Sequence, residues 1–214
     1  MEKDKGRFYW WQWFLNIVRN GLFWYGVHNR LARIGIMINP YYWELENTGT
    51  ITSPKIKGNT EEFIVDYLSL EEIEALISRI KGIRNDEFIE GIKRGQKCIG
   101  LRHKGEIAAY MCIDFKSFEY NKREFQLKSN EAYLLNMYTF EKFRGRNLAP
   151  YLRFKSYELL QKANRDTIYS ITVYFNKSSL RFKKKLGVKH LKLYLYIGLF
   201  KKINWNFRLR TFDQ

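Results

Sequence analysis

Two arginines, a glycine and an asparagine occupy residues 144–147, directly before an apolar-periodic segment. We expect a strand to end just before them and a helix to begin near Asn147. The first backbone N–H groups of a helix have no partner inside the helix, and its dipole adds positive potential there. Arg144 and Arg146 add permanent charge and forked donors that suit phosphate oxygens. The pattern predicts a turn around Gly145 that cradles a pyrophosphate group; an ordinary loop glycine is the alternative for this stretch alone.

The segment from Arg144 to Ala149 resembles a known motif. Its sequence, RGRNLA, is similar to motif A of the GNAT superfamily of N-acetyltransferases, R/Q-x-x-G-x-G/A, whose turn holds the pyrophosphate of acetyl-coenzyme A. Arg144 fills the first position and Ala149 the last, whereas Asn147 replaces the first motif glycine. Asn tolerates left-handed backbone geometry and is a good helix cap, so the replacement is compatible with the turn.

A second stretch, NKSSLRFKKKLGV, resembles motif B of the same family, N-x-x-A/S-x-x-x-Y-x-x-x-G-F. Asn176, Ser179, Gly187 and the apolar Val188 fall at matching spacings. Two motifs in the right order and in the expected structural settings are more specific than either motif alone.

The resemblance covers about residues 38–200 and implies an α/β (α+β) fold. This is a GNAT-like mixed, mostly antiparallel sheet with splayed central parallel strands, flanked by helices. The strands at 131–140 and 166–175 would splay apart, and the pantetheine arm of acetyl-CoA would lie between them. The cofactor-binding residues implied in this way are Met137, Tyr138, Thr139, Arg144, Gly145, Arg146, Asn147, Leu148, Ala149, Asn176 and Ser179.

The reaction implied by the family is direct attack of a primary amine on the thioester of the acyl-CoA. A general base must take a proton from the amine. Glu131, thirteen residues before Arg144, resembles the base glutamate of the histone-acetylating branch; a solvated carboxylate or a chain of waters is the alternative. Lys183 occupies the motif-B tyrosine position, where it would act as the acid, contact a coenzyme phosphate or lie on a solvated basic helix face. Tyr174 is the substitute candidate for the acid.

The elements that must position these residues follow from apolar periodicity and from helix and turn signals. Ser69 and Glu72 form a capping-box pattern at the start of one helix. We expect strands at 38–47, 97–115 (two, joined by a turn), 131–140, 166–175, 190–200 and 204–212, and helices at 69–80, 85–93, 147–164 and 178–186. The last two strands should close the chain as an antiparallel pair.

Composition and charge limit the class of protein. The chain has 214 residues, 45% of them hydrophobic and 17% aromatic, which suits a folded domain rather than a disordered chain. We expect an appendage at 1–37 and a GNAT-like acyltransferase domain at 38–214. The net charge is +16, and residues 141–214 hold 18 Lys/Arg against 4 Asp/Glu. An acidic partner is therefore expected. The family resemblance favours the coenzyme as this acidic partner. Nucleic acid is not expected, because the lysine run 183–185 fits a solvated helix face.

The cysteines and histidines do not indicate a metal or a redox site. Cys98 and Cys112 are expected to be buried, reduced thiols, which suits a cytoplasmic protein. His28, His103 and His190 lack ligand spacing, so we expect no metal. The first residues lack a cleavage site, and Arg19 interrupts their apolar run, so neither a signal peptide nor a membrane span is expected.

The aromatic, basic segment at 8–36 lies outside the resemblance. Its tryptophans and arginines suit a helix in a membrane interface, which would place the protein peripherally at the inner face of an anionic membrane. The alternative is packing on the catalytic domain or on a second subunit in a homodimer. The acceptor would be a small amine, with an amino sugar or a lipid-linked precursor as candidates. A longer-chain N-acyltransferase and a non-catalytic basic binding protein of the same fold are the alternative functions.

Overall fold

The computed structural model describes residues 30–31, 34–46, 52–58, 63–80, 85–200 and 202–213. The helix predicted at 8–36 lies almost wholly outside these residues. The described chain forms two compact units. One contains the residues up to Glu44 together with 171–185 and 189–214, and the other contains 45–170 and 186–188.

Most strands belong to one mixed, mostly antiparallel sheet, as predicted. Their hydrogen-bonded order is β10–β9–β1–β8–β7–β4–β3–β2. The strands are β1 (Ile36–Glu46), β2 (Phe63–Tyr67), β3 (Lys97–His103), β4 (Glu106–Asp114), β7 (Glu131–Thr139), β8 (Thr167–Val173), β9 (Lys189–Leu199) and β10 (Ile203–Thr211). The β7–β8 pair is parallel, whereas β2–β3, β3–β4, β4–β7 and β9–β10 are antiparallel.

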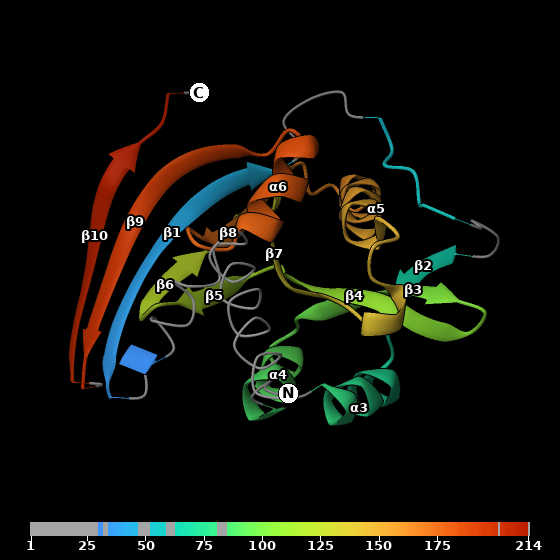
Figure 1. Ribbon diagram of the computed structural model, residues 1–214, viewed down its shortest axis with the longest axis horizontal. Coiled ribbons are helices and arrows are strands. Elements are labelled where there is room, and N and C mark those ends of the chain that lie inside the picture. Colours follow the sequence, from blue (N-terminus) through green and yellow to red (C-terminus); the bar gives the residue numbers. More distant parts are fainter. Residues whose placement is uncertain are drawn as a thin grey trace, which may run out of the picture. The chain divides into compact units, whose positions relative to one another are not determined.

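The first unit contains β10, β9, most of β1 and helix α6 (Lys177–Lys185) (Figure 1). The closing antiparallel pair is confirmed. Its neighbour is β1, the first strand of the chain, which lies beside β9. Tyr41 of β1 stacks on Tyr194 of β9 at 5.4 Å between ring centroids, and the Tyr41 hydroxyl donates to Asn206 of β10 at 2.9 Å. These contacts join the three strands.

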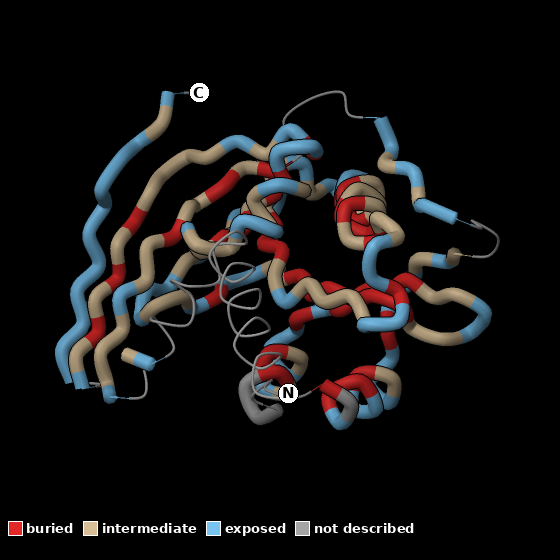
Figure 2. The backbone as a smooth tube through the Cα atoms, in the orientation of Figure 1, coloured by how far each residue is buried: buried red, intermediate tan, exposed pale blue. Residues whose placement is uncertain are grey.

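The second unit places helices on both faces of β3, β4 and β7 (Figure 1). Helix α5 (Leu148–Lys162) contacts one face, and α3 (Leu70–Arg79) and α4 (Asn85–Lys93) pack on the other. The capping box predicted for α3 is present, with both reciprocal Ser69–Glu72 bonds formed. Buried residues concentrate along β3 and β4, whereas every residue of β10 in the first unit is exposed (Figure 2).

Three strands were missed by the sequence analysis. Strand β2 is a short edge strand of five residues. Strands β5 (Ser117–Tyr120) and β6 (Arg123–Gln126) form a hairpin around Asn121 and Lys122, whose φ angles are 51° and 59°. A two-residue turn with two positive φ angles is the preferred hairpin connection, and Asn favours its first position. The signal was therefore present in the sequence.

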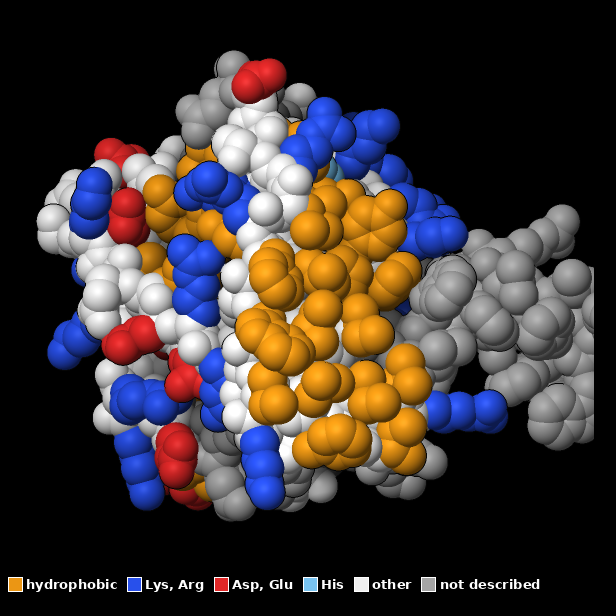
Figure 3. Space-filling view, turned by 90° about the vertical axis from the view of Figure 1, so that its left-hand side faces the viewer, with side chains coloured by type: hydrophobic (Ala, Val, Ile, Leu, Met, Phe, Trp, Pro, Cys, Tyr) orange, Lys and Arg blue, Asp and Glu red, His pale blue; other side chains and the backbone are white. Residues whose placement is uncertain are grey.

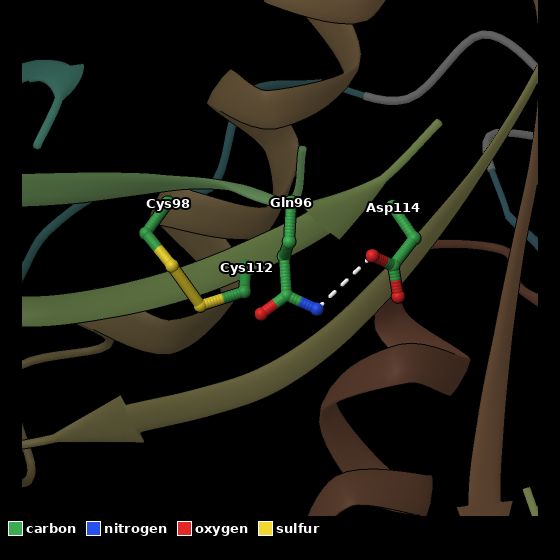
Figure 4. The surroundings of a disulfide bond; sticks show 4 residues. All are labelled: Gln96, Cys98, Cys112 and Asp114. Carbon is green, nitrogen blue, oxygen red and sulfur yellow. Dashed lines mark hydrogen bonds between the residues drawn. A yellow bond between two sulfur atoms is a disulfide. The ribbon is translucent and has the colours of Figure 1, made fainter. Parts of the chain in front are cut away.

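The prediction of two reduced thiols is wrong, because Cys98 and Cys112 form a disulfide (Figure 4). Both residues are buried, as expected. They face each other across β3 and β4 because a register shift after Leu101 moves Cys112 opposite Cys98. Without that bulge, simple counting from the His103–Glu106 turn would pair Cys98 with Met111. The expectation of a cytoplasmic location loses the support it took from reduced thiols.

We expect this disulfide to contribute about 3 kcal/mol to the free energy of unfolding, because it closes a loop of 14 residues. Denaturant unfolding with and without reductant measures the difference. A Cys98→Ala/Cys112→Ala variant should be as unstable as the reduced protein and should not respond to reductant. If a thiol reagent detects two free cysteines in protein that was unfolded without reductant, the disulfide is absent and this prediction is wrong.

Candidate functional site

The predicted turn before α5 is present in the second unit. A short 3-10 turn, Glu141–Phe143, follows β7, and Gly145 then adopts a φ of 81°. Asn147 is the N-cap of α5 and has left-handed angles, φ 66° and ψ 24°. The expectation that Asn tolerates left-handed geometry at this position is confirmed. Pro150 lies in the first turn of the helix, where its missing N–H removes no helical bond.

The backbone donors of this turn are available to a ligand. Among the described residues, the N–H groups of Gly145, Asn147, Leu148 and Ala149 have no recorded acceptor. Asn147 makes no side-chain cap bond to the helix. A Cβ atom placed on Gly145 would meet nothing within 4 Å. The turn therefore presents several amides at the positive end of a helix, with open space in front of its glycine.

A loop from an earlier part of the chain holds the turn in place. The Asn147 side-chain amide donates to the carbonyl of Lys55 at 2.8 Å. The backbone N–H of Lys57 donates to the carbonyl of Arg146 at 2.9 Å. These contacts use the side chain and a carbonyl of the turn, and they leave its amides uncommitted. No local pattern in the sequence could have revealed partners some ninety residues away.

The two arginines lie on either side of the turn. Arg144 is exposed, its Nε donates to the Thr139 carbonyl at 3.2 Å, and its guanidinium lies 5.7 Å from the centre of the Tyr138 ring. The Arg146 guanidinium lies 5.1 Å from the centre of the Phe63 ring. Arg144 also pairs with the exposed Glu141 carboxylate at 3.3 Å, and Arg146 is half-buried. An exposed ion pair is weak, so Arg144 can turn towards a phosphate, to which a charged hydrogen bond is stronger than a neutral one.

Strand β7 has a bulge directly before Met137–Thr139, the segment expected to contact pantetheine. Tyr110 pairs with Tyr138 but Cys112 pairs with Leu135, so β7 contains one extra residue, and Asn136 there has a φ of 50°. The recorded pairs between β7 and β8 end at Leu134. Bulges are frequent beside active sites, where they redirect backbone groups. This feature was not predicted from the sequence.

Glu131 begins β7, six residues before Met137. Its carboxylate accepts from the Lys128 N–H at 2.8 Å and from the Tyr169 hydroxyl at 3.4 Å. A strand rises about 3.3 Å per residue, so about 20 Å of β7 separates Glu131 from Met137. A role as base would require the acceptor amine to bind near the beginning of the strand, and Glu131 stays a prediction.

Asn176 and Ser179 of motif B belong to the first unit, whereas Gly187 and Val188 belong to the second. Asn176 caps α6, because its side-chain oxygen accepts from the Ser179 N–H at 3.1 Å. Tyr174 is 45% exposed and stacks on Tyr42 at 5.6 Å. Their roles towards a coenzyme or a leaving thiol stay predictions.

Lys183 is buried rather than solvated, which corrects one of the alternatives considered for the run 183–185. Its ammonium donates to Glu44 at 2.7 Å and to the Thr172 hydroxyl at 2.6 Å. His190 Nδ1 lies 3.0 Å from the other Glu44 oxygen. The cluster connects β1, β8, α6 and β9 within the first unit. Sequence reasoning treated His190 as isolated, because its carboxylate partner is far away in the chain.

This cluster holds Glu44 in its charged form. Burial alone would raise the pKa of the Glu44 carboxyl, but the bond with His190 and the Lys183 charge outweigh it, and the pKa lies below the ordinary value of 4.5. A carboxyl with a lowered folded-state pKa stabilises the protein fully above its unfolded-state pKa. That stability is lost as the pH falls through the folded-state value.

We therefore expect Glu44→Gln to be less stable than wild type at neutral pH, with a difference that shrinks as the pH falls below about 4.5. Denaturant unfolding of both proteins at a series of pH values measures this. A difference that stays constant or grows over the acidic range would contradict the assignment.

The described residues contain no group of three or more His, Cys, Asp or Glu side chains arranged to hold a metal ion. Every helix within the described ranges is too short or too polar to span a bilayer.

The comparisons with known proteins give matches among solved structures. No family model matches the chain, and no curated protein matches it significantly. A protein assigned as a GNAT-family acetyltransferase from Novosphingobium aromaticivorans is 20% identical, with a TM-score of 0.53 over 77% of this chain and 65% of that one. A GNAT-family acetyltransferase from Colwellia psychrerythraea is 14% identical, with a TM-score of 0.56 over 78% and 59%.

A GCN5-related N-acetyltransferase from Kribbella flavida is 12% identical, with a TM-score of 0.53 over 79% of this chain and 62% of that one. The chain thus spans less than two thirds of each of these three proteins. At such identities the similarity establishes the architecture, and it agrees with the strand and helix order described above. The chain has the fold of the GNAT acetyltransferases.

Proposed function

We propose that this protein is an N-acyltransferase that moves an acyl group, acetyl in the first instance, from acyl-CoA to a primary amine. The observation that carries the proposal is the turn before α5. The N–H groups of Gly145, Asn147, Leu148 and Ala149 donate to no acceptor among the described residues, Gly145 faces open space, and Arg144 and Arg146 lie on either side. A helix N-terminus with free amides and adjacent arginines is suited to a diphosphate.

The chain's own residues fit the coenzyme at this place. The N–H groups of Gly145, Asn147, Leu148 and Ala149 would bind the diphosphate, and the two arginines would neutralise its charge. The backbone of β7 after the bulge at Asn136 would bind the pantetheine amides. Asn176 and Ser179 are assigned to the same coenzyme by resemblance.

The coenzyme supplies an activated acyl group as a thioester. Attack by the amine forms the amide bond, breaks the carbon–sulfur bond and releases the free thiol of coenzyme A, while the amine loses one proton. The protein must accept that proton and hold the amine in place. Glu131 is the proposed base, and Lys183 or Tyr174 the proposed acid. The acceptor is proposed to be a small amine such as an amino sugar or a lipid-linked precursor.

The burial of Lys183 favours one alternative, a non-catalytic basic binding protein of the same fold that engages RNA or anionic lipid. Lys183 occupies the motif-B tyrosine position, and its ammonium is held by Glu44 and Thr172. In such a protein the cluster would be purely structural.

Thiol release from acyl-CoA in the presence of a panel of primary amines tests the proposal. We expect amine-dependent release with acetyl-CoA, and none from a variant in which Arg144 and Arg146 are both alanine. A series of donors with longer acyl chains distinguishes acetyl transfer from long-chain transfer. No release for any amine or donor, together with salt-dependent binding of RNA or anionic lipid, would favour the non-catalytic alternative.

A further inference from the structure

The β9–β10 hairpin has an apolar face that is turned outwards. Ile203, Trp205, Phe207 and Leu209 alternate along β10 and are each between 44% and 55% exposed. Alternate residues of a strand lie on the same side of the sheet. Across the strand pair, Ile203, Trp205 and Phe207 stand opposite Leu199, Ile197 and Leu195. We call these seven residues the hairpin face.

The opposite side of β10 carries the polar residues. Asn204 accepts from the Tyr196 hydroxyl at 2.6 Å, and Asn206 accepts from the Tyr41 hydroxyl at 2.9 Å. These bonds fix the register, since a slip by one residue would turn every side chain to the other side. Every residue of β10 is exposed, and the buried Tyr194 and Tyr196 of β9 lie on the polar side of the hairpin. A sheet with one solvated side normally turns its polar residues outwards. In this hairpin the side away from the buried tyrosines carries the apolar residues instead, so the apolar face is specified by the sequence.

The hairpin face forms a continuous hydrophobic patch with lysine and arginine side chains at its margins (Figure 3). Lys202 adjoins the patch at the hairpin turn. At the other end, a bulge between Arg208 and Arg210 brings Arg210 opposite Leu193, on the apolar side. Residues 177–214 contain eleven Lys/Arg and one Asp. An apolar surface with cationic ends is thus present in the most basic part of the chain.

We propose that the hairpin face docks on the surface of an anionic lipid bilayer. Trp205 and Phe207 would enter the interface between headgroups and acyl chains, and Lys202 and Arg210 would contact anionic headgroups. Aromatic and basic residues together are typical of interfacial anchors. Residues 5–43, which include most of β1, contain five Lys/Arg and no Asp or Glu, so this segment has the same charge preference.

Charge decides between this partner and a second copy of the chain. Pairing two hairpin faces would bring together two surfaces with the same positive charge, which opposes association. An anionic bilayer removes this repulsion and also covers the apolar side chains. The proposal does not depend on the acyltransferase function, and it concerns a different unit from the turn before α5.

Co-sedimentation of the full chain with lipid vesicles tests the proposal. We expect binding to vesicles that contain phosphatidylcholine and phosphatidylglycerol, and much weaker binding to phosphatidylcholine alone. Trp205→Ser/Phe207→Ser should lower the partition coefficient at least tenfold, because burying one large apolar side chain is worth about a factor of ten. Lys202→Glu/Arg210→Glu should weaken binding to the anionic vesicles specifically.

The matched control is Ile64→Ser/Tyr67→Ser, which removes two apolar side chains, 62% and 39% exposed, from the edge strand β2 of the other unit. It should bind vesicles like wild type. Thermal unfolding of each variant checks its folding, and the charge variant provides a second test if the apolar variant does not fold. The proposal is overturned if wild type does not bind anionic vesicles, or if both hairpin variants bind these vesicles as strongly as wild type does. A different result would assign the hairpin face to self-association. In that case wild type would sediment as a dimer and would not bind vesicles, and Trp205→Ser/Phe207→Ser would dissociate the dimer.

Discussion

Replacing Arg153 by methionine should lower the free energy of unfolding by about 3–5 kcal/mol, because it leaves a buried carboxylate without its cation. Arg153 of α5 makes two bonds with Glu46 of β1, Nη2–Oε1 at 2.6 Å and Nε–Oε2 at 3.2 Å, and the two side chains are 3% and 0% exposed. The hydroxyls of Tyr157 and Ser170 donate to the same carboxylate. The four groups connect β1, α5 and β8 in the second unit.

Two further variants identify the buried charge as the cause. Lys155→Met removes a cation from the same helix. Its partner, Glu158, is 2.7 Å away, and the two side chains are 31% and 43% exposed. The substitution should therefore cost less than about 1 kcal/mol. Adding Glu46→Gln to Arg153→Met removes the uncompensated charge and should restore part of the stability. Equal losses for Arg153→Met and Lys155→Met in denaturant unfolding would refute this explanation.

Changing Arg144 and Arg146 together to alanine should weaken coenzyme A binding at least about 100-fold. A hydrogen bond to a charged group contributes about 1.5–3 kcal/mol, and about 1.4 kcal/mol corresponds to a factor of ten. Calorimetric titration measures the change. The control is Arg94→Ala/Arg123→Ala, which removes the same net charge from exposed arginines elsewhere and should leave the affinity within a few-fold of wild type.

A pair of glycine variants tests the backbone of the same turn. Gly145→Ala places a methyl group in the open space in front of this turn. The control, Gly105→Ala, places a methyl group at the separate turn between β3 and β4. The two glycines have φ angles of 81° and 79°, and neither Cβ would meet an atom within 4 Å. Both variants should lose similar stability, about 1–2 kcal/mol. Only Gly145→Ala should weaken coenzyme A binding, and equal affinities would argue against a diphosphate at this turn.

Features encoded within a few residues could be predicted from the sequence. The Ser69–Glu72 capping box, the helix Asn85–Lys93 and the start of α5 all follow from local propensity and capping chemistry. The left-handed Asn147 likewise follows from the tolerance of Asn for that conformation. The turn that carries the functional proposal belongs to this group.

Features that depend on distant pairings could not be predicted. Glu44 and Lys183 are 139 residues apart, and Glu46 and Arg153 are 107 apart. A charged residue in a strand pattern gives no indication of the partner that will bury it. The bulge in the β3–β4 hairpin decides that Cys98 faces Cys112, and the bulge at Asn136 reshapes β7 before Met137. Both bulges follow from pairing between strands rather than from composition.

The central claim is that the amides at the beginning of α5 bind the diphosphate of an acyl-CoA. Titration of the folded protein with coenzyme A and with pantetheine, which lacks the diphosphate and the nucleotide, tests it most directly. The account predicts saturable binding of coenzyme A at moderate salt and far weaker binding of pantetheine. A folded protein that binds neither compound, or that binds both equally well, would contradict it.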